Sequence, residues 1–214
     1  MTYKSLNLPL DPIKNTFNID YIQADFISNN IYHSGLDKVG YIQVDPNVIL
    51  KEEIIDTFTS INLKLSSVII FIVPLPRNNA LMHSDVESIR HVAWKKVICS
   101  VNWELTSNVQ PKFSWYQTTK EAIMPAKESL LRTDITLFGI HYGKRRQPGV
   151  DPDKDTLIDT VSTSTGVFLV RTDIPHIVEI ADEQPKFRYA LSARFENRFK
   201  SWDDAVEIFQ PLIK

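Results

Sequence analysis

His83 and Asp85, separated by a single serine, are the residues whose types and spacing best suit chemistry. They follow an apolar run rich in β-branched residues, 68–73, and a polar turn. In an extended chain, side chains at positions i and i+2 leave the same face, so the imidazole and the carboxylate point together. Such a pair supplies two of the three ligands of a 2-His-1-carboxylate iron site. The spacing therefore predicts two ligands of a metal centre, and the third must come from elsewhere in the chain.

His176 is the best placed of the other histidines to complete such a site. It comes directly after a turn and begins an apolar segment that runs to Ile180. The remaining three lie in loop-like segments or close behind the first pair. Taken singly, His83 and Asp85 also fit a hydrogen-bonded pair in a turn, and His176 a histidine satisfied by backbone. Together the three residues are our candidate metal ligands.

The order His-x-Asp, a long gap, His, and then Arg on the next predicted strand resembles the Fe(II)- and 2-oxoglutarate-dependent oxygenases. The resemblance covers about residues 61–195. Several local runs look like the aspartyl/asparaginyl β-hydroxylase-like members and like small oxygenase-like proteins carried by phages. These runs are 81–85, 101–105, 114–116, and 172–176 followed by 185–188.

The resemblance implies a double-stranded β-helix, also called a jelly roll or cupin-like barrel, with flanking helices. It also implies an Fe(II) ion, 2-oxoglutarate as a cosubstrate, and dioxygen. The expected activity is hydroxylation of a C–H bond in an amino-acid-like or protein side-chain substrate, with release of succinate and CO2. No catalytic residue beyond the metal ligands is implied.

Arginine suits the distal carboxylate of 2-oxoglutarate because its planar fork is always charged and can pair with both oxygens. On the alternating segment 187–195, Arg188, Ala190, Ser192 and Arg194 share one face. Either arginine could reach the cosubstrate, and we favour Arg188 because its spacing fits the family better. Asn102 is a further candidate for this carboxylate, although an outer-face position suits it equally well.

Two other classes of function remain open. A cupin-like metal-binding protein that is not an oxygenase would use a similar barrel without 2-oxoglutarate, and usually has more histidine ligands close together. A non-catalytic interaction protein that kept the fold should have lost a ligand, whereas all are present here.

The elements that must position these residues are mostly strands. Patterns predict strands over 40–45, 61–73, 96–105, 113–117, 166–171, 176–180 and 187–195, with a hairpin joining the third and fourth. A helix is predicted from Pro46, with Asp45 as its N-cap. A C-terminal helix is predicted over 201–213, with Ser201 as its N-cap and Asp204 three residues on. This pattern predicts two sheets with both helices on one outer face. Residues 118–164 are expected to form a long irregular insertion over the pocket mouth.

Composition predicts a single domain over all 214 residues, with 43% hydrophobic and 23% charged residues. The formal net charge of −2 argues against nucleic acid as a partner, and the basic triplet 144–146 is expected in a solvated loop. No apolar run reaches the roughly eighteen residues needed to span a membrane, and the N-terminus lacks a secretory signal. A single cysteine, Cys99, fits a reducing compartment. We therefore expect a cytoplasmic protein, in the host cytoplasm if a phage encodes it. The sequence indicates no oligomeric state.

Overall fold

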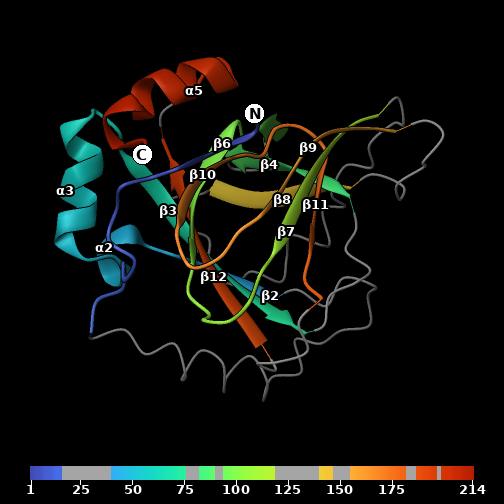
Figure 1. The fold of residues 1–214 in the computed structure, drawn as a ribbon. Helices are drawn as coiled ribbons and strands as arrows, with labels where there is room; N and C mark the ends of the chain where they lie inside the picture. The colour runs from blue at the N-terminus through green and yellow to red at the C-terminus, as the bar shows by residue number, and fades with distance from the viewer. Residues whose placement is uncertain are drawn as a thin grey trace.

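The computed structural model of the protein describes residues 1–15, 40–75, 82–89, 94–118, 140–146, 155–181, 187–196 and 199–214. Within these ranges the chain is mainly β, and its strands form two antiparallel sheets (Figure 1). The first sheet has the order β1 (Tyr3–Ser5), β10 (Val167–Arg171), β6 (Cys99–Glu104), β12 (Phe187–Phe195), β3 (Leu65–Pro74) and β2 (Gly40–Val44). The second has the order β5 (Trp94–Lys96), β4 (His83–Ile89), β11 (His176–Glu179), β7 (Lys112–Gln117) and β9 (Thr156–Ser162), and β8 (Ile140–Arg146) also pairs with β4.

The strand pairs are nested along the chain. In the first sheet β3 pairs with β12 and β6 pairs with β10, while in the second β4 pairs with β11 and β7 pairs with β9. The chain therefore changes sheet between β3 and β4, between β5 and β6, and between β6 and β7. It changes again on its return, between β9 and β10, between β10 and β11, and between β11 and β12. This arrangement is compatible with a β-sandwich and confirms the predicted mainly-β class.

Among the described residues, three helices cover the outer face of the first sheet (Figure 1). They are α2 (Pro46–Ile49), α3 (Glu52–Ser60) and α5 (Trp202–Phe209), the last continued by the 3-10 turn η1 (Gln210–Leu212). Both predicted N-caps are confirmed. The Asp45 side chain accepts a hydrogen bond from the Asn47 N–H, and the Ser201 hydroxyl accepts one from the Asp204 N–H.

The helix predicted from Pro46 proves to be two. Leu50 is extended and fully buried, and it separates α2 from α3. The N-terminal segment causes this break, because the Lys51 N–H donates to the Pro12 carbonyl and the Lys14 N–H donates to the Ile49 carbonyl. These bonds occupy backbone groups that a continuous helix would have used.

The main hydrophobic core lies between the first sheet and the helices. Phe58 of α3 is fully buried and meets Trp103, Phe195 and Phe209 edge to face. Fully buried side chains from β3, β6, β10 and β12 complete this core, among them Val68, Ile70, Val101, Leu169, Leu191 and Ala193. The prediction that helices cover one outer face is therefore confirmed.

Three sequence predictions are wrong in the described regions. The strands β6 and β7 do not form a hairpin, because they belong to different sheets. The segment 118–164 contains two strands, β8 and β9, which pair with β4 and β7. The basic triplet 144–146 lies in β8, with its backbone in register with residues 83–85, and not in a loop. The rest of that segment, 119–139 and 147–154, lies outside the described residues.

In the described part of the chain, no helix combines the length and apolar character that crossing a membrane requires.

Candidate metal centre

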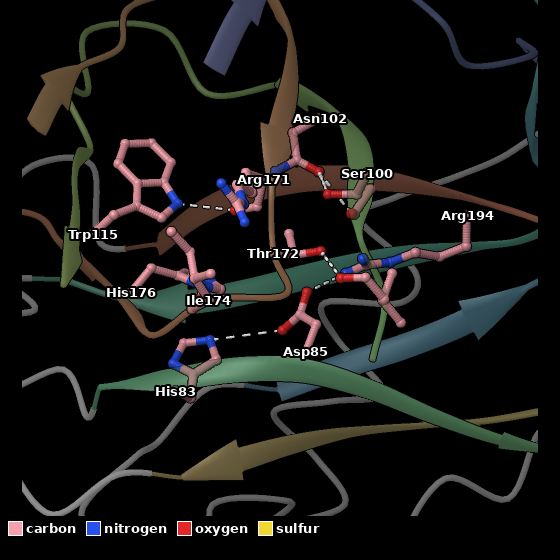
Figure 2. Close-up of polar contacts among 12 residues, drawn as sticks. His83, Asp85, Ser100, Asn102, Trp115, Arg171, Thr172, Ile174, His176 and Arg194 are labelled. Carbon is pink, nitrogen blue, oxygen red and sulfur yellow. Dashed lines mark hydrogen bonds and ion pairs between the residues drawn. The ribbon is translucent and has the colours of Figure 1, made fainter. Parts of the chain in front are cut away.

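The structure brings His83, Asp85 and His176 together between the two sheets (Figure 2). His83 opens β4 and His176 opens β11, and these two residues are direct partners in the antiparallel pairing. Their ring centroids lie 4.5 Å apart, and the His83 Nε2 lies 3.9 Å from the Asp85 Oδ1. One ligand atom from each of the three residues lies within 4.8 Å of the others, and all three residues are buried. The group can therefore hold a metal ion.

The ring of His176 is oriented by the backbone. Its Nδ1 lies 3.0 Å from the Ile174 carbonyl oxygen, which can only accept, so Nδ1 carries the proton and donates. This tautomer leaves the lone pair on Nε2, as a metal-binding histidine requires.

Backbone hydrogen bonds fix the position of Asp85 on both sides. Its N–H donates to the Thr172 carbonyl (2.8 Å), and its own carbonyl accepts from the Val97 N–H (3.1 Å). Thr172 also donates its hydroxyl to the Val97 carbonyl at 2.7 Å. The carboxylate therefore projects from a backbone that neighbouring segments hold in place.

Arg194 is an ion-pair partner of Asp85. Its Nη2 lies 2.7 Å from Oδ2 of Asp85, and each side chain is only 4% exposed. The other carboxylate oxygen, Oδ1, is the one nearest the His83 ring. The aspartate therefore has one oxygen engaged by a cation and one directed toward the histidines, which suits a single bond to a metal.

A cavity opens beside the three candidate ligands, with an empty volume of about 560 Å³ that includes its mouth. The structure places all three predicted cosubstrate-binding residues in its wall. The full lining is Phe71, Val73, His83, Asp85, Ser100, Asn102, Phe113, Val170, Thr172, His176, Val178, Arg188, Ala190, Ser192 and Arg194.

Asn102 faces this cavity and not the outer surface. Its Oδ1 accepts hydrogen bonds from the hydroxyls of Ser192 (2.6 Å) and Ser100 (3.0 Å), as Figure 2 shows for Ser100. With both bonds on the oxygen, the amide nitrogen is the group left to donate to a ligand.

Arg188 is held by a residue that sequence reasoning missed. Its Nε donates to Oε2 of Glu104 at 2.8 Å, and the two residues are 7% and 6% exposed. Burial raises the pKa of the Glu104 carboxyl above its ordinary value, and the adjacent guanidinium opposes that rise. A charged residue at the end of the apolar segment 96–105 was the available signal, because a buried carboxylate needs a partner.

Trp115 packs in the core and does not line the cavity. It is fully buried, stacks on Phe113 with ring centroids 5.8 Å apart, and donates its Nε1–H to the Arg171 carbonyl at 2.9 Å.

Comparison of this chain with models of protein families and with curated proteins finds no match in either. The geometry of the cavity and its residues therefore has to carry the functional conclusion.

Proposed function

We propose that this protein is an Fe(II)- and 2-oxoglutarate-dependent oxygenase that hydroxylates a C–H bond of an amino-acid-like or protein side-chain substrate. The observation that carries the proposal is the buried His83–Asp85–His176 group, set in a cavity whose wall also contains Arg188. Two imidazoles and one carboxylate, with open positions opposite them, form the ligand set of non-haem Fe(II) oxygenases.

The nested strand pairs support the double-stranded β-helix expected for that class. The segment β3–β7 runs antiparallel to the segment β9–β12, so that the innermost pair is β7–β9 and the outermost is β3–β12. Successive pairs alternate between the sheets. A long antiparallel pair of segments wound over two sheets is the arrangement expected of a jelly roll, and it supports this part of the proposal.

The charges around the cavity favour a dianionic ligand. Asp85 is paired with Arg194 and Glu104 with Arg188, so these four groups sum to zero. A divalent cation on neutral imidazoles then adds two positive charges in a buried place. A ligand with two carboxylates, such as 2-oxoglutarate, balances them, and uncompensated buried charge is costly.

The two arginines have different positions in this proposal. Arg194 is bonded to Asp85 at the metal end. Arg188 lies six residues earlier on the same face of β12, with Ala190 and Ser192 between them. Arg188, assisted by the Asn102 amide, is therefore our choice for the distal carboxylate, and Arg194 for orienting the metal ligand.

Bound Fe(II) would supply the reaction with dioxygen by which the 2-oxo acid becomes succinate and CO2 while a substrate C–H becomes C–OH. His83, Asp85 and His176 would hold the ion and would leave its remaining coordination positions to the ligands. Apolar cavity residues, including Val73, Val170 and Val178, limit water around the reacting atoms.

The test is succinate formation from 2-oxoglutarate with Fe(II) and ascorbate, screened against peptides and small metabolites for stimulated turnover. An anaerobic mixture of protein, Fe(II) and 2-oxoglutarate should also show the visible absorption band of the chelated complex. Asp85→Ala should lose both signals, and an exposed carboxylate variant, Asp11→Ala, should keep them. Absence of both signals from protein that retains one metal ion per chain would sink the proposal in favour of a metal-binding non-oxygenase.

A further inference from the structure

We propose that Glu104 is a positioning residue that holds Arg188 by its Nε edge, so that the opposite Nη edge receives a ligand carboxylate. This inference rests on the proposed function for the identity of the ligand. The hydrogen bond between Arg188 and Glu104 carries it, together with the lining of the cavity.

The geometry leaves one edge of the guanidinium available. Glu104 and Arg188 lie 84 positions apart in the sequence, yet the pairing of β6 with β12 brings them together. The direct partner of Glu104 in the sheet is Ala190, two residues from Arg188. Within the described residues, Arg188 has one polar contact, from Nε to Glu104. Its Nη nitrogens therefore remain for a group in the cavity that Arg188 lines.

The lining residues place Glu104 behind the arginine. A second, smaller cavity is lined by Glu104 and also by Asn102, Phe113, Val170 and Arg188, all four of which line the large cavity too. Glu104 does not line the large cavity. The carboxylate thus approaches Arg188 from the smaller cavity, and a ligand approaches from the larger one.

An ion pair that served only the stability of the fold would not affect which ligand binds. Buried ion pairs are weak sources of stability, because desolvation offsets their attraction. A guanidinium fixed at one edge, however, presents its remaining N–H groups in a constant direction, which is how a planar fork gains selectivity for carboxylate. Glu104 should therefore control which 2-oxo acid binds, and not only how stable the fold is.

The first experiment measures binding of two acids to the Mn²⁺-loaded protein under anaerobic conditions. 2-Oxoglutarate has the distal carboxylate, and 2-oxobutanoate shares the 2-oxo acid end but lacks it. The dissociation constant of 2-oxobutanoate divided by that of 2-oxoglutarate reports the contact with the distal carboxylate alone. Glu104→Met, which removes the acceptor, should lower this ratio about 10- to 100-fold. Glu104→Gln keeps an oxygen that accepts from Nε, and should retain the ratio within about 3-fold.

Two further variants keep the test decisive. Arg188→Lys leaves a cation beside Glu104, but an ammonium group has no second N–H edge to offer the ligand, so the ratio should fall as it does in Glu104→Met. This variant therefore provides the test if Glu104→Met does not fold. Glu196→Gln alters an exposed ion pair with Lys64 (3.0 Å) and should leave the ratio unchanged. An unchanged ratio in either Glu104→Met or Arg188→Lys overturns the proposal. So does an equal loss of affinity for both acids, which indicates a structural role.

The second experiment needs no ligand, and therefore separates this inference from the proposed function. The Arg188 Nε–H resonance, assigned by its loss in Arg188→Lys, should exchange slowly with solvent in the wild type and in Glu104→Gln. In Glu104→Met it should exchange rapidly. If the wild type binds neither acid, the proposed function fails while this signal still decides the role of Glu104. A slowly exchanging Nε–H in folded Glu104→Met overturns that role.

Discussion

Replacing Arg194 by Met tests its ion pair with Asp85, one of the three candidate metal ligands. Met keeps an unbranched apolar side chain and removes the guanidinium, leaving Asp85 as a buried carboxylate that is 4% exposed. Removing one partner of a buried pair typically costs about 3–5 kcal/mol. Since domains are stabilised by only about 5–15 kcal/mol, we expect Arg194→Met to lose a large part of the free energy of unfolding. The double variant Asp85→Leu/Arg194→Met removes both charges and should recover most of the loss.

Urea unfolding in EDTA, followed by tryptophan fluorescence, measures this free energy for the metal-free protein. With a slope of about 2–3 kcal/mol per M, the midpoint of Arg194→Met should fall by about 1–2 M. The control is Lys64→Met, whose partner Glu196 lies 3.0 Å away in an exposed pair, and whose loss should cost about 0–1 kcal/mol. A loss below about 1 kcal/mol in Arg194→Met, or a double variant less stable than the single one, refutes a tightly buried pair.

Three other perturbations test separate parts of the molecule. His176→Ala should abolish metal retention through desalting, measured by elemental analysis against Asp11→Ala; equal metal content in the two would contradict the ligand assignment. Because burial raises the folded-state pKa of Glu104 above 4.5, the folded protein holds that proton more tightly than the unfolded chain. The contribution of Glu104 to the free energy of unfolding should therefore fall as pH rises through the window just above 4.5. Glu104→Gln should flatten this pH dependence, measured by urea titrations. If the wild type and the variant show the same slope of unfolding free energy against pH, Glu104 does not titrate in that window. Phe58→Ala should cost about 3–5 kcal/mol in the same urea assay but leave metal content unchanged, because Phe58 lies on the helix side of the first sheet; metal loss would show that the two faces are coupled.

Period-two alternation explains why so much of the candidate site could be predicted. A strand places every second side chain on one face, and this rule alone put His83 beside Asp85 and Arg188 on the same face as Arg194. The segment 187–195 forms β12 with those same bounds. Local capping chemistry likewise located the start of both predicted helices, because an N-cap depends on residues within three positions.

Long-range pairing explains what could not be predicted. The polar segment between β6 and β7 looks like a hairpin turn, but the chain uses it to pass to the other sheet. The strand β9 lies at an edge, and its largely exposed residues give no apolar pattern. The bond from Glu104 to Arg188 joins strands far apart in sequence, and no local pattern reports such a contact.

Alternation along β12 also separates residues that serve folding from residues that serve binding. Leu191 and Ala193 pack against the helices, whereas Arg188 and Ser192 line the cavity. Substitutions at the first set act on whether the protein folds, and substitutions at the second act on what it binds. A lineage could therefore change its ligand by altering Arg188 and Ser192 while its hydrophobic core stayed the same. Sequence similarity would decay fastest in the cavity residues and slowest in the intervening ones, so the fold could outlast any particular activity.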